Sequence, residues 1–187
     1  VVAGYSAAVK LNTFALTGFT TLGNGLSSFT AQNIGAGRPE RVKQGFRAGA
    51  GMTLCVAVPF IAAFVFAGPQ MVRLFLSAPS ADALAQGTLF LNIVAPFYVL
   101  ISLKLAADGV LRGAGCSLPP MIIMLSSFVA FRQIYLYVFS HLTHSFYVVA
   151  LAYPMGWILC STLLLIYYYR GGWEKKSTIL TQMKKKA

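Results

Sequence analysis

Five long apolar stretches alternate with short polar segments along the chain. They predict helical spans at about residues 4–32, 44–67, 83–111, 120–140 and 147–169, because roughly 20 apolar residues in a helix cross about 30 Å of hydrocarbon. The first and fourth stretches are the least apolar, since one contains Lys10 and Asn12 and the other Arg132. The pattern therefore predicts an all-α, polytopic membrane bundle over residues 1–169, followed by a polar tail over residues 170–187.

The composition agrees with this pattern. Hydrophobic residues make up 57% of the 187 residues and charged residues only 10%, whereas soluble domains carry roughly 25% charged residues. The formal net charge of +11 would suggest a nucleic-acid partner in a soluble protein. In a chain of membrane spans, the need to keep basic residues on one side of the bilayer explains the net charge better. We therefore expect the chain to contact a lipid bilayer and not a nucleic acid.

Lysine and arginine gather on one side of the predicted membrane. Eleven of them follow the first, third or fifth span, while the opposite side has Arg73; the eleven are Arg38, Arg41, Lys43, Arg47, Arg112, Arg170, Lys175, Lys176, Lys184, Lys185 and Lys186. Since cytoplasmic loops collect these residues, the first span should begin outside and the tail should be cytoplasmic. The chain begins with Val1 rather than Met, and we expect further spans before it.

Two Gly-Ala-Gly segments mark the ends of the first and third spans. The first contains Gly35 and Gly37 and is followed by Pro39, and the second contains Gly113 and Gly115 and is followed by two prolines. Glycine accepts the left-handed backbone that ends many helices, and proline cannot continue a helix. We expect these glycines to adopt that conformation, and the two corners are the nearest feature to an internal repeat.

Prolines and glycines also occur inside the predicted spans. Pro59, Pro96 and Pro154 lie inside the second, third and fifth spans, where each removes a backbone hydrogen bond and permits a kink. Gly45 and Gly49 have the GxxxG spacing that lets two membrane helices approach closely. Bends and close contacts of this kind suit a transporter, although both are also common in other membrane helices.

Six residues are candidates for an ion or substrate pathway: Lys10, Asn12, Thr13, Lys104, Asp108 and Arg132. A charge at mid-bilayer costs about 3 kcal/mol, so it usually faces a partner or a water-filled cavity. Lys104 and Asp108 are four residues apart on one helix face, where they can form an ion pair or a cation or proton site. Arg132 has either a structural partner or a place in a cavity wall. Asn12 or Thr13 could line a cavity, whereas Lys10 could reach the outer interface.

No pattern in the sequence indicates catalysis or a resident metal. His141 and His144 have an HxxH spacing without an acidic or cysteine companion on that side, so an interfacial pair is favoured. Cys55, Cys116 and Cys160 are far apart and form no CxxC pair, so neither a disulfide framework nor a zinc site is indicated. A nucleophile with its base, a paired-carboxylate site and a phosphate-binding loop are all missing from the sequence. We therefore expect neither an enzyme nor an organic cofactor.

Three motifs together carry a family resemblance: FTAQNIGAGRPERVKQG at residues 29–45, VLRGAG at 110–115, which contains Arg112, and FRQIYLYVFS at 131–140. In this order and spacing they resemble the C-terminal half of a multidrug and toxic compound extrusion transporter. The resemblance implies two six-helix lobes around a central cavity, with the five spans as the eighth to twelfth helices and the N-terminal lobe missing from this chain. It also implies export of small cationic or amphipathic compounds across an inner membrane in exchange for Na⁺ or H⁺.

The sequence departs from the family pattern at two positions. Cys116 stands where many relatives have Asp, and Ile101 stands where some well-studied members carry an acid. Asp108 is not at that position, which leaves the choice between Na⁺ and H⁺ open. Two other functions also stay open: a flippase for lipid-linked saccharides, whose anionic cargo would suit a basic cavity, and a non-transporting remnant, because five helices cannot enclose a two-lobed pathway.

Overall fold

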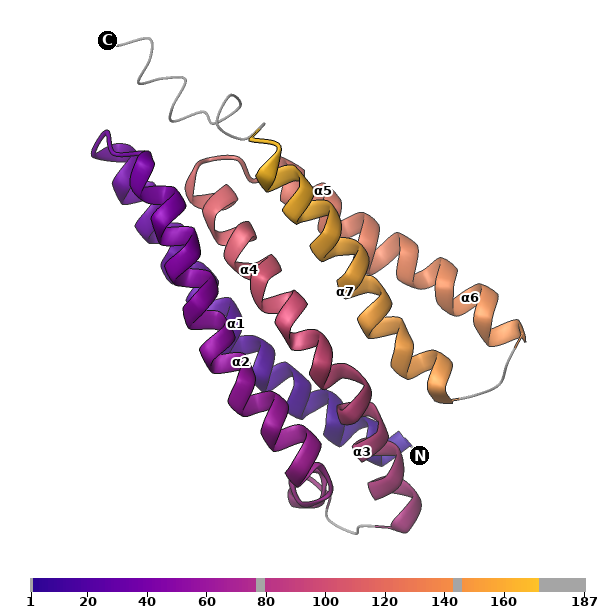
Figure 1. The fold of residues 1–187 in the computed structure, drawn as a ribbon. Coiled ribbons are helices and arrows are strands. Elements are labelled where there is room, and N and C mark those ends of the chain that lie inside the picture. Colours follow the sequence, from indigo (N-terminus) through magenta and orange to yellow (C-terminus); the bar gives the residue numbers. More distant parts are fainter. Residues whose placement is uncertain (1, 77–79, 143–145, 172–187) are drawn as a thin grey trace.

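The computed structural model describes residues 2–76, 80–142 and 146–171, and these residues form helices joined by short turns (Figure 1). In chain order the elements are α1 (Val2–Gly35), α2 (Glu40–Leu74), α3 (Ala81–Val94), η1 (Ala95–Phe97), α4 (Tyr98–Gly113), α5 (Leu118–Leu125), η2 (Ser126–Phe131), α6 (Arg132–Leu142) and α7 (Phe146–Tyr169). η1 is a 3-10 turn and η2 is a π-helical turn. The predicted tail lies outside the described residues, apart from its first two positions.

Five long helical segments result, as the hydropathy pattern predicts, because η1 joins α3 to α4 and η2 joins α5 to α6. Within the described residues, four segments are long and apolar enough to cross a membrane: Glu40–Leu74, Ala81–Gly113, Leu118–Phe139 and Phe146–Tyr169. α1 has the length, with 34 residues, but it is not one of these four. The all-α membrane bundle is confirmed, and α1 is the segment whose surface differs from that of the others.

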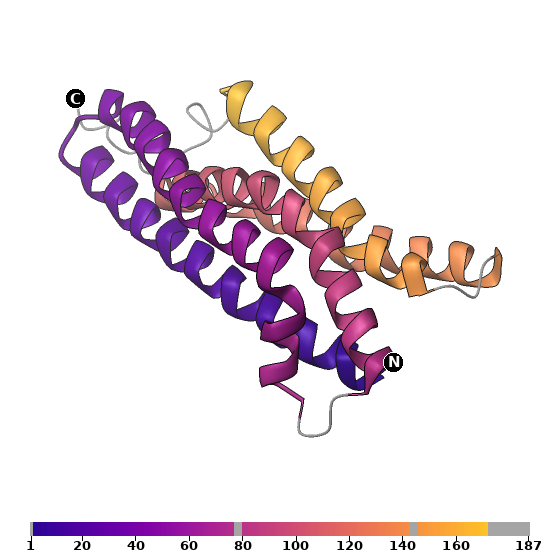
Figure 2. The same cartoon turned by 60° about the horizontal axis from the view of Figure 1, so that its bottom comes forward.

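α4 lies in the middle of the bundle. α1 and α2 form a hairpin on one side of it, and α7 with the α5–α6 segment lies on the other (Figure 1); the same order holds in the view of Figure 2. Apolar side chains at the helix contacts form two buried clusters, one around Phe19, Phe64 and Tyr98 and the other around Val42 and Leu111. Most of α4 is consequently buried, so a polar side chain on it faces other helices.

α2 extends beyond the predicted span of 44–67 at both ends. It begins at Glu40 and continues to Leu74, with a kink at Ala67, where φ is −116° and ψ is 16°. Pro69 is compatible with the segment after the kink, because the first turn of a helix has no partner for the N–H that proline lacks. The predicted boundary therefore marks a bend and not the end of the helix.

The predicted proline interruptions differ in their effect. Pro96 lies in η1, where the α-helical hydrogen-bond pattern changes to a 3-10 turn. Pro59 and Pro154 lie inside the continuous helices α2 and α7. Position along the sequence alone does not show which proline breaks its helix, since neighbouring helices decide whether the bend is accommodated.

The two Gly-Ala-Gly corners end their helices with the same hydrogen bonds. At each corner the last glycine donates its N–H to a carbonyl three residues back, and the next residue donates to one five residues back, at 2.8–3.0 Å. This is the Schellman pattern. Gly37 and Gly115 have φ of 72° and 75°, so the predicted left-handed backbone is confirmed for them. It is wrong for Gly35 and Gly113, which keep helical backbone as the last residues of α1 and α4.

Glycines also let α1 and α4 approach closely. A Cβ atom at Gly109 would overlap the carbonyl oxygen of Gly23, and one at Gly113 would overlap that of Ser27. Glycine permits this backbone contact because it has no side chain to hold the helices apart. The close contact brings the polar side chains of α4 within reach of those on α1.

Candidate functional site

Three charged side chains recur at intervals of four residues along α4: Lys104, Asp108 and Arg112. Residues four apart lie on the same helix face, one above the other. Lys104 and Asp108 are each only 3% exposed, while the Arg112 side chain at the end of the helix is 38% exposed. This α4 charged row therefore leads from the interior of the bundle to its surface.

Asp108 pairs with Arg112 and not with Lys104. The Asp108 Oδ2 atom lies 3.0 Å from Arg112 Nε, and no ion pair between Asp108 and Lys104 is found among the described residues. The predicted helix face is correct, but the predicted Lys104–Asp108 ion pair is wrong. The reason is the direction of helical side chains, which lean toward the N-terminus of the helix, so that an acid is better placed to meet a base four residues after it than one four residues before it.

Arg112 also connects α4 to α1. Its Nη2 atom donates a hydrogen bond to Oδ1 of Asn24 at 3.1 Å, next to the point where Gly23 and Gly109 bring the helix backbones together. The sequence marks Arg112 as part of a corner motif and as one of the basic residues on the predicted cytoplasmic side. In the structure its guanidinium holds a buried carboxylate on one helix and an exposed amide on another.

The second carboxylate oxygen of Asp108 is without a partner among the described residues. Oδ1 is buried and makes no hydrogen bond within the part of the chain that the structure describes. A buried polar atom without a partner costs free energy, and an unpaired carboxylate oxygen is an acceptor for a proton or a small cation. This makes the α4 charged row, with Asn24, the candidate ion site.

Lys104 extends away from Asp108 into the next helical segment. Its Nζ atom donates to the sulfur of Met124 at 3.1 Å and lies 5.4 Å from the centre of the Phe128 ring, within the range of a cation–π interaction. Phe128 belongs to the π-helical turn η2, a conformation that is frequent at functional sites. Neither partner could be predicted from the sequence, because contacts between separate helices leave no local pattern.

The candidates near the start of α1 separate into buried and exposed residues. Asn12 is buried, and its Oδ1 accepts a hydrogen bond of 2.9 Å from the hydroxyl of the equally buried Tyr98. Lys10 and Thr13 are exposed, and the Thr13 hydroxyl donates to the carbonyl of Val9 in its own helix. Asn12 therefore has a structural partner on α4, whereas Lys10 and Thr13 belong to the surface of α1.

Arg132 is held by aromatic rings. Its guanidinium carbon lies 3.8 Å from the centre of the Tyr153 ring, and the Tyr153 hydroxyl is 3.0 Å from the hydroxyl of Tyr5. These contacts connect α6 to α7 and α7 to α1. They favour the structural interpretation of Arg132 over a place in a cavity wall.

A polar stripe runs along the exposed face of α1. At 100° per residue its members fall within an arc of about 120°, and all of them are exposed: Ser6, Lys10, Thr13, Thr17, Thr20, Thr21, Asn24, Ser28 and Gln32. The hydroxyls of Thr13, Thr17, Thr21 and Ser28 donate to carbonyls four residues back, and that of Thr20 to one three residues back. The stripe explains why α1 is less apolar than the other segments. Its members recur every three or four residues, so it could have been predicted from the sequence.

The six predicted pathway residues therefore do not form one site. Asp108 is in the ion site, Lys104 extends from the same helix face, and Lys10 and Thr13 lie on the polar stripe with Asn24. No three His, Cys, Asp or Glu side chains among the described residues are grouped to hold a metal ion. The predicted HxxH pair is not tested, because His144 lies outside those residues.

Comparison with known proteins identifies the family. The family model MatE matches residues 1–138. A probable multidrug resistance protein, YpnP of Bacillus subtilis (strain 168), is 30% identical over 140 residues, which are 75% of this chain and 31% of that protein. The chain thus spans about a third of the length of this relative. No solved structure matches the chain significantly. The motifs, the helical bundle and both matches agree, and the chain belongs to the MatE family of multidrug and toxic compound extrusion transporters.

Proposed function

We propose that the protein containing this chain exports small cationic or amphipathic compounds across an inner membrane in exchange for Na⁺ or H⁺. Membership of the transporter family and the name of the multidrug resistance relative support this proposal. Because the chain covers 31% of that relative, a second lobe from elsewhere in the protein would complete the pathway. The two lobes would then rock about a central site in alternating access.

The polar stripe of α1 supports a water-filled pathway beside this helix. A row of exposed hydroxyl, amide and ammonium groups over the length of a helix is a poor match for lipid, since polar side chains in a membrane protein usually face a cavity or a partner. The other surface helices expose large apolar residues, such as Phe66 on α2 and Ile134 on α6. α1 therefore contributes one wall of the proposed pathway.

The unpaired oxygen of Asp108 is the observation that carries the proposed ion coupling. In the ionised state the carboxylate attracts Arg112, which also bonds Asn24 on the polar stripe. A proton or Na⁺ at Oδ1 would neutralise the carboxylate and weaken its attraction for the guanidinium. The link between α4 and α1 would then loosen, so ion binding would change how the pathway helix is held.

The test is ion-driven efflux by the full-length protein with Asp108→Asn, which keeps the shape of the side chain but cannot ionise. The matched control is Asp82→Asn, which removes an exposed acid at the start of α3. Ethidium export from proteoliposomes would be measured under an imposed Na⁺ or H⁺ gradient. We expect Asp108→Asn to abolish the dependence of export on the gradient and Asp82→Asn to preserve it.

Either of two results would contradict the proposal. Unchanged ion-driven export by the Asp108→Asn protein would remove this carboxylate from coupling. No export by the unmodified protein under either gradient would refute the antiport function itself. The flippase alternative, which needs a basic cavity, is not favoured. Of the three cations among the pathway candidates, two, Lys104 and Arg132, are engaged by Met124, Phe128 and Tyr153 inside the lobe.

A further inference from the structure

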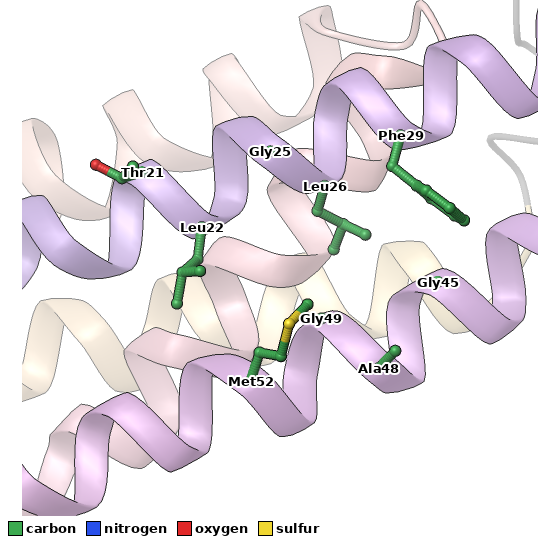
Figure 3. A pocket seen from close by; sticks show the side chains of 9 residues that line it. All are labelled: Thr21, Leu22, Gly25, Leu26, Phe29, Gly45, Ala48, Gly49 and Met52. Carbon is green, nitrogen blue, oxygen red and sulfur yellow. The ribbon is translucent and has the colours of Figure 1, made fainter.

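An apolar groove lies between α1 and α2, apart from the α4 charged row. Its volume is about 250 Å³, and Figure 3 shows Leu22, Leu26 and Phe29 of α1 on one side and Ala48 and Met52 of α2 on the other. The glycines of the predicted GxxxG pair, Gly45 and Gly49, also line it. Among the residues that the structure describes, no charged side chain lines it.

The predicted close approach at Gly45 and Gly49 is confirmed by the contacts within this groove. A Cβ atom at Gly45 would overlap the ring of Phe29, and one at Gly49 would lie 2.7 Å from a methyl carbon of Leu26. The two glycines of α2 therefore contact side chains of α1, but open space remains beside these contacts, where Gly25 of α1 has no atom within 4 Å of its Cβ position. The space results from small residues on both helices.

The chemistry of the lining side chains indicates which class of ligand the groove can bind. The one side-chain hydroxyl in the lining belongs to Thr21, and it already donates to the carbonyl of Thr17. The volume is below the roughly 300–1,000 Å³ of pockets that enclose drug-sized molecules. A flexible hydrocarbon chain fits such a groove, whereas a cationic compound would find no acceptor.

Positive charge lies at one end of the groove. Arg41 precedes Gly45 by four residues, which is one helical turn on the same face of α2, and Arg38 lies in the turn between α1 and α2; both are exposed. Side chains of α2 lean toward this turn, because it is at the N-terminus of the helix. Glu40 is one residue before Arg41 and therefore about 100° around the helix from it, directed away from the groove.

We propose that this groove binds one acyl chain of an anionic phospholipid, with the lipid phosphate beside Arg41 and Arg38. The α1–α2 turn is on the side that the lysine and arginine pattern predicts to be cytoplasmic, where anionic lipids attract basic residues near the membrane surface. The lining accounts for the hydrocarbon part of the ligand and the two arginines account for its charge. The proposal does not depend on transport activity.

Native mass spectrometry of the full-length protein in detergent tests the proposal. The probes are dioleoyl phosphatidylglycerol and dioleoyl phosphatidylcholine, which share acyl chains and differ in net charge. We expect the unmodified protein to retain phosphatidylglycerol preferentially. Arg41→Gln should reduce this preference about fivefold, since one basic residue near the surface contributes about 1 kcal/mol to the attraction.

A second pair of variants tests the groove itself. Gly25→Leu places a side chain in the open space and should lower retention of both lipids severalfold, and Ala48→Leu fills the same groove from α2 if the first variant does not fold. The control is Gly51→Leu, an exposed position of α2 outside the lining, also with no atom within 4 Å of its Cβ position. For the charge, the control is Arg47→Gln, which removes an exposed arginine. Arg47 lies six positions after Arg41 and therefore about 120° around the helix from it.

Three outcomes would overturn the proposal. Equal lipid retention by the Gly25→Leu and Gly51→Leu proteins would show that lipid does not enter the groove. Equal loss of preference in Arg41→Gln and Arg47→Gln would indicate general attraction to basic residues. A dimer that disappears in Gly25→Leu, without a change in lipid adducts, would assign the groove to a second copy of the chain.

Discussion

The contact between α1 and α4 at Gly109 is close enough for one added methyl group to disturb it. In Gly109→Ala the new Cβ would overlap the carbonyl oxygen of Gly23 and lie 3.2 Å from its carbonyl carbon. Because this neighbour is backbone and cannot rotate away, the two helices have to separate. Overpacking of this kind costs about 1–3 kcal/mol, and separation would also stretch the 3.1 Å hydrogen bond from Arg112 to Asn24.

A matched substitution isolates this cost. Alanine favours a helix over glycine by about 1 kcal/mol, which partly offsets the loss in Gly109→Ala. Gly18→Ala on α1 has the same gain in helix propensity, but no atom lies within 4 Å of the Cβ position at Gly18, so the new methyl group meets no neighbour. The difference in stability between the two variants should therefore be about 1–3 kcal/mol, with Gly109→Ala the less stable.

Thermal unfolding of the full-length protein in detergent, followed by circular dichroism, measures this difference. The Gly109→Ala protein should unfold several degrees below the Gly18→Ala protein, and the latter should match or exceed the unmodified protein. Equal unfolding temperatures for the two alanine variants would refute the reasoning, because α1 and α4 could then not be in backbone contact at this point.

Two further predictions concern the first part of α1 and the corner that follows its last residue. Asn12→Ala leaves the buried hydroxyl of Tyr98 without its acceptor and should lower the free energy of unfolding by about 1–3 kcal/mol, whereas the exposed Thr13→Ala should change it by less than about 0.5 kcal/mol; equal effects in thermal unfolding would contradict the buried hydrogen bond. Gly37→Ala forces a side chain into left-handed backbone and should cost about 1–2 kcal/mol, while Gly35→Ala, at a helical position, should be neutral or stabilising. A loss of stability confined to the Gly35 variant would show that the corner is built differently.

The apolar pattern was sufficient to predict the class of fold. Segments of 20 or more apolar residues can satisfy their backbone hydrogen bonds in a membrane only as helices or closed barrels, so the all-α bundle and its five segments follow from composition and length. The two corners could also be assigned, since the need for left-handed backbone at Gly37 and Gly115 arises within a few residues. The sequence did not distinguish these two glycines from Gly35 and Gly113, which keep helical backbone. Conformational preferences that depend on a few neighbouring residues can be predicted from the sequence.

The pairing of the charges was decided by the tertiary structure. Spacing placed Lys104, Asp108 and Arg112 on one face of a helix, but the choice of partner depended on side-chain direction and on Met124, Phe128 and other groups from neighbouring helices. The same holds for Arg132, whose aromatic partner Tyr153 is 21 positions away in the sequence.

What the sequence by itself determined is the membrane setting, the helical segments, the helix-ending glycines and the family motifs, because each depends on residues close together in the chain. Only the tertiary structure decided that Asp108 keeps one unpaired oxygen, that Arg112 bonds Asn24, and that small residues leave an apolar groove between α1 and α2. These features depend on the distance between helices, which the packing of many side chains sets together and which no short stretch of sequence encodes.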